Sequence, residues 1–238
     1  MKSVDKFFKK LQSIQFDSYP KGVVPVCDRI SGTSFFPGGD GLWKHENKIQ
    51  DLKLGGIMII GNNFDNVAGF KKSLSLGSEP INCPTWKNIR KLLQDAEIDL
   101  TDCFFTNVYV GLMESNSNVG MFPGAKSESF KQKCLELLEY QISEQKPKVI
   151  LTLGRFVPPL LARLSPDLSS WINMQNFANL DQNGRQILAN VHFCDGNVIS
   201  NVVALTHPSQ RHLNIKKRQY LNLIGNEAEI AMLHAAVG

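Results

Sequence analysis

Unbroken apolar runs alternate along the chain with segments of helical periodicity. The runs expected to form strands are residues 56–60, 103–110, 148–153, and one or two further strands within 186–206. The segments expected to form helices are residues 85–96, 127–145, 154–164 and 215–236. Continuous apolar strands separated by helices are typical of a parallel sheet that is covered on both faces. The pattern therefore predicts an α/β fold.

The beginning of the chain has a different pattern, in which one amphipathic segment precedes a long loop. Apolar residues recur there at helical spacing, namely Val4, Phe7, Phe8, Leu11 and Ile14. Residues 17–50 are rich in glycine and proline, above all at 34–43, and predict a long ordered loop. We expect a single domain over residues 1–238, with residues 1–53 packed on its core.

Composition is typical of a globular protein and not of a membrane protein. Of 238 residues, 42% are hydrophobic and 20% charged, and no apolar run approaches the ~20 residues that span a bilayer. The opening segment also lacks the apolar stretch of a secretory signal. The five cysteines include no CxxC pair, which argues against zinc or iron–sulfur sites. We expect no metal, no cofactor and reduced thiols, with a cytoplasmic location (at the nucleoid in a bacterium) or a nuclear one in a eukaryote.

The positions of the cations are more informative than their number. A net charge of +4 permits a polyanionic partner without requiring one. The last apolar run, however, is followed by a basic cluster that consists of Arg211, His212, Lys216, Lys217 and Arg218. Clustered cations are typical of surfaces that contact the phosphates of nucleic acids.

Polar residues follow three of the apolar runs, where a parallel sheet forms its ligand crevice. GNNFDN, residues 61–66, follows the first run, Asn107 lies at the end of the second, and His207 and Pro208 follow the last. An amide can read the edge of a nucleobase, and a histidine can donate to a developing oxyanion or act as an acid or base. Each motif also has a structural interpretation, as a helix-capping turn, a loop tether and a buried histidine respectively.

Together these motifs resemble those of the uracil-DNA glycosylase superfamily. That family has a Gly-x-(Asp/Asn)-Pro-like loop after its first strand, an Asn after the second and His-Pro-Ser after the last. The chain has GNN at 61–63, Asn107 and HPSQR at 207–211, in the same order. HPSQR is similar to the His-Pro-Ser-Pro-Arg of the single-strand-selective monofunctional branch. PKVILTLGRF, residues 147–156, is similar to another strand of the family, so the resemblance covers about residues 54–220.

The resemblance implies a three-layer α/β/α fold with a central, mostly parallel four-stranded sheet. It also implies a monofunctional DNA glycosylase that removes uracil or a related deaminated base in base excision repair. Asn63, as in the single-strand-selective and mismatch-specific branches, would orient the attacking water. His207 would stabilise charge on the departing base. A lysine that could form a Schiff base is not evident at the expected loops.

Two further groups of residues follow from the same resemblance. The base-binding group consists of Gly61, Phe64, Asp65, Phe70 and Asn107. Asn107 would bind the edge of uracil, and Phe64 or Phe70 would stack on the flipped base. The DNA-binding group consists of Pro208, Ser209, Arg211, Lys216 and Lys217. Ser209 would hold a phosphate, and Arg211 would enter the base stack as the base flips out. The implied partner is single- or double-stranded DNA that contains a deaminated base, bound by a monomer.

The chain departs from the family pattern in its first loop. Phe64 stands at the expected proline, and Asp65 and Asn66 stand where the main uracil enzymes have Tyr-His. Asp65 is therefore a second candidate for activating water. Two alternatives stay open: a superfamily member that binds DNA or a modified base with weak or no hydrolysis, and a hydrolase of free nucleosides or nucleotides. The basic cluster argues against the latter.

Overall fold

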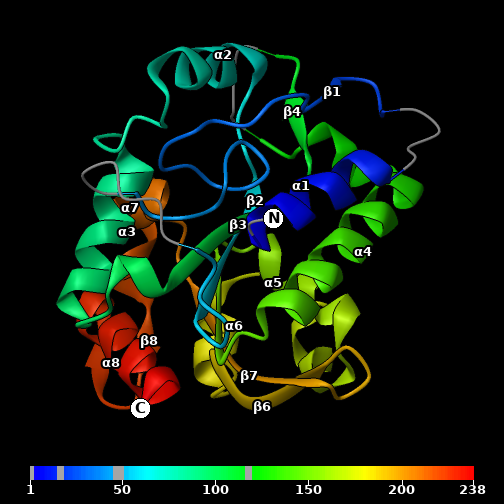
Figure 1. Ribbon diagram of the computed structural model, residues 1–238. Coiled ribbons are helices and arrows are strands. Elements are labelled where there is room, and N and C mark those ends of the chain that lie inside the picture. The colour runs from blue at the N-terminus through cyan, green and yellow to red at the C-terminus, as the bar shows by residue number, and fades with distance from the viewer. Residues whose placement is uncertain (1–2, 15–18, 45–50, 116–119) are drawn as a thin grey trace.

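The computed structural model describes residues 3–14, 19–44, 51–115 and 120–238 (Figure 1). At its centre is a five-stranded sheet with the order β3-β2-β5-β7-β6. Its strands are β2 (Ile57–Asn63), β3 (Cys103–Tyr109), β5 (Val149–Leu153), β6 (Ile187–Phe193) and β7 (Val198–Leu205). The pairs β2–β3, β2–β5 and β5–β7 are parallel, and β6 pairs antiparallel with β7. The predicted mostly parallel sheet is confirmed.

The sheet has one strand more than the resemblance implied. Residues 186–206 form both β6 and β7, joined by a tight turn in which Cys194, Asp195 and Gly196 have φ values of 53°, 54° and 85°. Successive positive φ values let the chain reverse direction into an antiparallel pair. The four parallel strands are therefore extended along one edge by β6.

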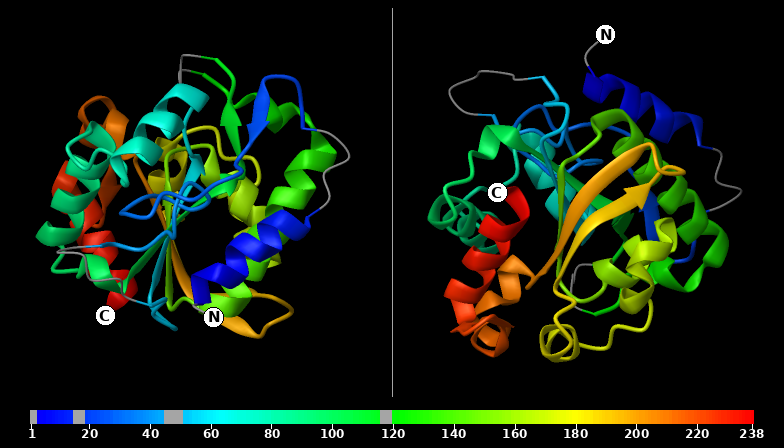
Figure 2. Two further views of the ribbon diagram at one scale, coloured as in Figure 1. Left: turned by 45° about the horizontal axis from the view of Figure 1, so that its top comes forward. Right: turned by 90° about the horizontal axis from the view of Figure 1, so that it is seen from below.

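Helices cover both faces of the sheet, which gives the predicted three layers (Figure 2). One face is covered by α1 (Ser3–Ser13), α4 (Glu128–Gln145) and α5 (Val157–Leu161), and the other by α3 (Pro84–Asp95) and α8 (Gly225–Val237). Side chains alternate between the faces of a strand. In β2, Met58 and Ile60 accordingly belong to the first core, and Ile57 and Ile59 to the second.

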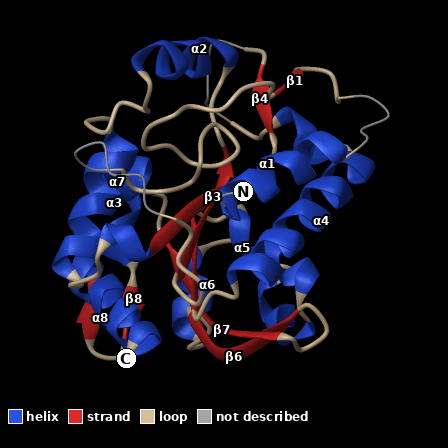
Figure 3. Cartoon of the chain, in the orientation of Figure 1, coloured by secondary structure: helices blue, strands red, loops and turns tan. Residues whose placement is uncertain are grey.

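Smaller elements surround these layers (Figure 3). The other α-helices are α2 (Val67–Leu76), α6 (Phe177–Gln182) and α7 (Arg211–Asn214). The short strands form two antiparallel pairs, β1 (Val23–Pro25) with β4 (Gly111–Met113), and β8 (Gln219–Tyr220) with β9 (Leu223–Ile224). The 3₁₀ turns are η1 (Leu100–Asp102), η2 (Pro123–Lys126), η3 (Ala162–Leu164), η4 (Pro166–Trp171), η5 (Pro208–Gln210) and η6 (Ile215–Lys217). Within the described ranges, none of the helices combines the length and apolar character needed to cross a membrane.

The predicted first helix corresponds to α1, which lies against the sheet and α4. The side chain of Phe7 is completely buried. Its ring centroid lies 5.2 Å from that of Phe104 on β3 and 6.1 Å from that of Tyr140 on α4. Of the predicted loop at 17–50, residues 17–18 and 45–50 lie outside the described residues, and the remainder contains β1.

The predicted final helix over 215–236 is wrong in its first part, because α8 begins only at Gly225. The preceding residues form η6 and the β8–β9 hairpin. Leu221 and Gly225 have φ values of 52° and 67°, in the left-handed region that a continuous right-handed helix cannot contain. The apolar residues before Gly225 have a spacing that is compatible with a helix, but no helix forms there. Ile215, for example, is buried from the short turn η6.

Candidate active site

The carboxyl ends of β2, β3 and β7 meet along one edge of the sheet, because these strands run in the same direction. Gly61 near the end of β2 is the partner of Asn107 on β3. A β-carbon on Gly61 would lie 2.3 Å from Oδ1 of Asn107. Only glycine at this position lets the Asn107 amide lie directly against β2. The structure thus brings together two of the predicted base-binding residues.

Asn63 lies at the very end of β2 and is only partly buried. Nδ2 of Asn62 donates to Oδ1 of Asn63 over 2.9 Å. This contact fixes the rotation of the Asn63 amide and identifies its oxygen as an acceptor. An amide oxygen has two lone pairs, so the same atom can also accept a hydrogen bond from water.

The two aromatic candidates for stacking on a base occupy different environments. Phe70 on α2 is buried in a small core with Val26, Ile30 and Leu112. Phe64 is only partly buried, and its ring lies edge-on to that of Phe70 at 5.9 Å. The structure therefore does not bring Phe70 to the edge of the sheet, because helix α2 turns its side chain inward. Its place is behind Phe64, as a support.

The end of the GNNFDN segment caps a helix, which is the structural interpretation that the sequence left open for this motif. Oδ1 of Asn66 accepts the backbone N–H of Gly69 over 2.8 Å and so caps α2. Oδ1 of Asp65 accepts the N–H of Asn66 over 2.7 Å, and its carboxylate lies where a β-carbon of Gly69 would stand. The Asp65 carboxylate is thus turned toward the amino-terminal end of α2.

Glu79 is a carboxylate near this loop that sequence reasoning missed. Its Oε2 accepts the Phe35 N–H over 2.8 Å and the indole N–H of Trp86 over 3.2 Å. Burial raises the pKa of Glu79 to about 7, the negative charge of Asp65 adds to the rise, and the two hydrogen bonds oppose it. A glutamate in a polar loop has no local pattern that would have marked it.

The raised pKa of Glu79 predicts a pH dependence of stability. Because the folded protein binds this proton more tightly than the unfolded chain, where the pKa is near 4.5, the free energy of unfolding falls as pH rises toward 7. Glu79→Gln keeps an acceptor oxygen and should remove this dependence. Urea unfolding from pH 5 to 8 should show wild type losing about 2 kcal/mol relative to the variant. Glu136→Gln, an exposed site on α4, is the control, and equal slopes for both variants would contradict the prediction.

Asn107 is buried and tethered to the N-terminal loop. Its Nδ2 donates to the carbonyl oxygen of Phe36 over 3.2 Å, and the residue is 3% exposed. This is the structural role that the sequence left open for a strand-end asparagine. The second Nδ2 hydrogen and the amide oxygen are the groups with which it could read a base.

His207 follows β7 directly, and its ring is oriented by the residues after it. The backbone N–H of Ser209 donates to Nδ1 of His207 over 3.3 Å, and the Ser209 hydroxyl lies 2.8 Å from the same nitrogen. A backbone N–H can only donate, so Nδ1 is the acceptor and Nε2 carries the proton of the neutral imidazole. The Ser209 hydroxyl therefore orients His207, in addition to the phosphate-binding role that the resemblance implied.

The surroundings of His207 favour the neutral form of its imidazole. Burial lowers the pKa of His207 below its ordinary value. Gly154, at the end of β5 with a φ of 83°, leaves the space beside the ring: a β-carbon there would lie 3.1 Å from Cβ of His207. On the other side, Nδ2 of Asn88 holds the carbonyl oxygen of the buried Pro208 over 2.8 Å.

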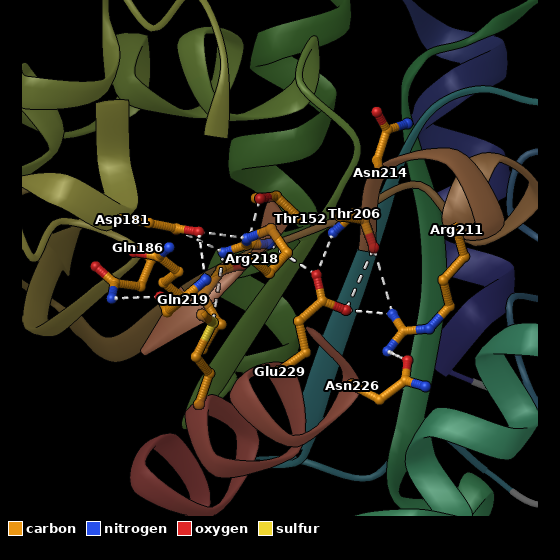
Figure 4. Close-up of polar contacts among 12 residues, drawn as sticks. Thr152, Asp181, Gln186, Thr206, Arg211, Asn214, Arg218, Gln219, Asn226 and Glu229 are labelled. Carbon is orange, nitrogen blue, oxygen red and sulfur yellow. Dashed lines mark hydrogen bonds and ion pairs between the residues drawn. The ribbon is translucent and has the colours of Figure 1, made fainter. Parts of the chain in front are cut away.

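Arg211, which was predicted to enter a base stack, instead has its guanidinium directed into the protein in this structure (Figure 4). It donates to the buried Glu229 carboxylate, and its Nη2 donates to Asn226 over 2.9 Å. Its side chain is 12% exposed. The Arg211 cation pairs with a carboxylate that would otherwise be a less compensated buried charge. Lys216 and Lys217, in contrast, are exposed.

A cavity of about 310 Å³ opens beside the ends of β2, β3 and β5. Its walls are largely aromatic and apolar and include Asn62, Tyr109, Phe122, Arg155, Phe156 and Met174. Tyr109 stacks on Phe122 at 4.8 Å, and the Arg155 guanidinium lies 4.8 Å from the Phe156 ring centroid. Burial raises the pKa of Tyr109 to about 12, so its hydroxyl stays protonated at neutral pH. Such a cavity suits a flat, partly polar ligand such as a nucleobase.

Sequence reasoning missed this cavity, although part of the signal was present. Arg155 and Phe156 follow β5 through Gly154, just as His207 follows β7. Other walls come from α5, from α4 and the segment before it, and from residues near 174. No local pattern connects the last two regions with β5. Within the described residues, no group of three or more histidine, cysteine, aspartate or glutamate side chains is arranged to hold a metal ion.

Comparison with known proteins identifies the family of the chain. The family model described as the uracil DNA glycosylase superfamily matches residues 57–227, which is more than half of the chain. The match extends from the first residue of β2 into α8 and so includes Asn63, Asn107 and His207. No curated protein matches the chain. The chain belongs to the uracil-DNA glycosylase superfamily.

Proposed function

We propose that this protein is a monofunctional DNA glycosylase that hydrolyses the N-glycosidic bond of uracil or a related deaminated base in DNA. The observation that carries the proposal is the orientation of His207, whose Nδ1 accepts the Ser209 N–H. The imidazole therefore presents an Nε2–H donor. A fixed neutral donor stabilises an oxygen on which negative charge develops. A deaminated base develops such charge on its carbonyl oxygen as it departs.

In the proposed reaction, the bond between the anomeric carbon and the base nitrogen breaks and a bond from that carbon to water forms. The bonding electrons leave with the base, which then takes up a proton, and the attacking water releases a proton to solvent. Asn63 orients the water through the amide that Asn62 holds. Asn107 offers an acceptor and a donor to the edge of the base.

DNA is the proposed partner, and the exposed Lys216 and Lys217 are the proposed phosphate contacts. The backbone N–H of Gln219, two residues after Lys217, donates to Asp181 over 2.9 Å. Nε2 of Gln186 donates to the Gln219 carbonyl oxygen over 3.2 Å. Gln186 directly precedes β6, which starts beside the carboxyl end of β7. The two lysines are thus anchored near the edge of the sheet that contains His207.

Lys216→Gln/Lys217→Gln should weaken DNA binding uniformly across sequences. For each phosphate that the protein no longer neutralises, the slope of log K against log salt should become shallower by about 1. Fluorescence anisotropy from 50 to 300 mM salt measures this slope. The matched control is Lys53→Gln/Lys148→Gln, which removes two cations before β2 and β5, at the opposite ends of the strands. Equal slopes for the two double variants would argue against these lysines as the DNA contacts.

The proposed activity is tested directly with single- and double-stranded oligonucleotides that contain uracil, hypoxanthine or xanthine. Incubation followed by alkali breaks the strand at any abasic site. Strand breaks that depend on His207 establish the glycosylase and identify its base. Intact strands from a protein that nevertheless binds the same oligonucleotides would contradict hydrolysis.

The second candidate function is a DNA-binding protein that has weak or no hydrolysis. The observation that favours it is the residue at position 63, where an asparagine cannot take a proton from water as a carboxylate can. Asn63→Asp distinguishes the two functions. If the amide limits the reaction, the carboxylate should increase the rate of base release, whereas a protein that only binds should stay inactive.

A further inference from the structure

A buried cluster of charged groups contacts Thr206, the residue that precedes His207 (Figure 4). At its centre, Oε1 of Glu229 on α8 accepts a hydrogen bond from Nη1 of Arg218 over 2.7 Å. Arg218 also donates twice to Asp181, through Nε over 2.9 Å and Nη2 over 3.1 Å. The Arg211 guanidinium contacts the other oxygen of Glu229. The cluster thus pairs two arginines with two carboxylates.

Glu229 contacts the residues on both sides of the HPSQ segment, residues 207–210. Its Oε1 accepts the backbone N–H of Thr206 over 2.7 Å, and its Oε2 accepts the Thr206 hydroxyl over 3.3 Å. Thr206 precedes the segment, and Arg211, which also donates to Oε2, follows it. One carboxylate on α8 therefore fixes both ends of the segment at the end of β7.

We propose that Glu229 is a positioning residue for His207, acting through Thr206 and Arg211. The inference rests on the proposed function of His207. The N–H of Thr206 is bonded to a carboxylate, and such charge-assisted bonds are short and strong. Because Thr206 and His207 are consecutive, a shift of this backbone moves the imidazole. Misplacing a catalytic group by about 1 Å can lower a rate roughly 100-fold.

The composition of the cluster supports a positioning role beyond stability. Removing water from four charged groups costs so much that well-packed apolar residues often stabilise a core equally well. The cluster is nevertheless buried, with side-chain exposures of 0% for Glu229, 1% for Arg218 and 2% for Asp181. Buried polar networks in which the partners are satisfied specify one arrangement of the surrounding chain. The chain that this network contacts, at Thr206 and Arg211, borders the segment with His207 on both sides.

Glu229→Gln is the first test, because it keeps the size of the side chain and replaces one acceptor oxygen by an NH₂ group. Single-turnover base release should fall roughly 10- to 100-fold, with the affinity for DNA within about twofold. The matched control is Glu227→Gln, the same substitution at an exposed glutamate of α8, which should leave the rate within about threefold. Thr206→Val removes only the hydroxyl contacts and should lower the rate a few-fold.

A double variant separates positioning from a general defect. If Glu229 acts through His207, Glu229→Gln should cause no further loss of rate in a His207→Ala background. If the two losses of rate multiply in the double variant, or if Glu227→Gln causes an equal loss, the proposal is overturned.

The decisive measurement does not require activity. NMR spectra of protein labelled with ¹⁵N-histidine, assigned with His207→Ala, report the tautomer and surroundings of the His207 ring. Its resonances should change in Glu229→Gln and stay unchanged in Glu227→Gln. Thr206→Val replaces Glu229→Gln if the latter does not fold. Unchanged His207 resonances would overturn the proposal. If wild type cleaves none of the oligonucleotides, the proposed function fails, and the spectra still decide whether Glu229 positions His207.

Discussion

His207→Ala should lower the single-turnover rate of base release by roughly 100- to 1000-fold while DNA affinity stays within about twofold. The reason is that the variant removes an oriented Nε2–H donor, which acts on charge that develops only in the transition state. The measurement is alkali-sensitive strand breakage with enzyme in excess, together with anisotropy for binding. The control is His234→Ala, an exposed histidine on α8. Comparable rates for His207→Ala and wild type would remove His207 from the mechanism.

The same role predicts the pH dependence of the rate. Protonation of His207 would place a second proton on Nδ1, and the Ser209 N–H would lose its acceptor. Because burial lowers the pKa of His207, the neutral form persists below the ordinary histidine pKa of about 6.5. The wild-type rate should therefore be constant above about pH 7 and fall only at lower pH. A rate that rises as the imidazole becomes protonated would indicate a general acid instead.

Arg218→Met should lower the free energy of unfolding by about 3–5 kcal/mol. The change keeps most of the side-chain volume and removes the cation that is shared by Glu229 and Asp181. Both carboxylates are then without this buried partner, and burying an uncompensated charge is expensive. Urea unfolding at pH 7, followed by circular dichroism, gives the difference, provided that both proteins unfold in a single transition.

The matched control for this prediction is Lys91→Met on α3. Lys91 pairs with Asp95 over 3.0 Å, but its side chain is 72% exposed. Solvent and salt weaken such a pair, so its loss should cost at most about 1 kcal/mol. If the two variants are destabilised equally, the buried network contributes no more to stability than a surface pair.

The fold was predictable because its pattern is local. Strands buried on both faces are continuous apolar runs, and the helices that cover them have apolar faces at helical spacing. The errors arose where local pattern and backbone conformation disagree. Residues 215–224 have helix-compatible spacing, but the left-handed φ of Leu221 and of Gly225 ends any helix there. The fifth strand likewise depended on the turn at 194–197.

The sequence predicts that one edge of the sheet contains Asn63, Asn107 and His207, because parallel strands place their carboxyl ends together. It does not predict the direction of each side chain at that edge. Arg211 points to Glu229, 18 residues away, and Arg218 to Asp181, 37 residues away. Such contacts depend on which helix packs beside which strand and on the removal of water from both partners. Arg211 thus belongs to a buried network and Phe70 to a core only because the tertiary structure encloses them.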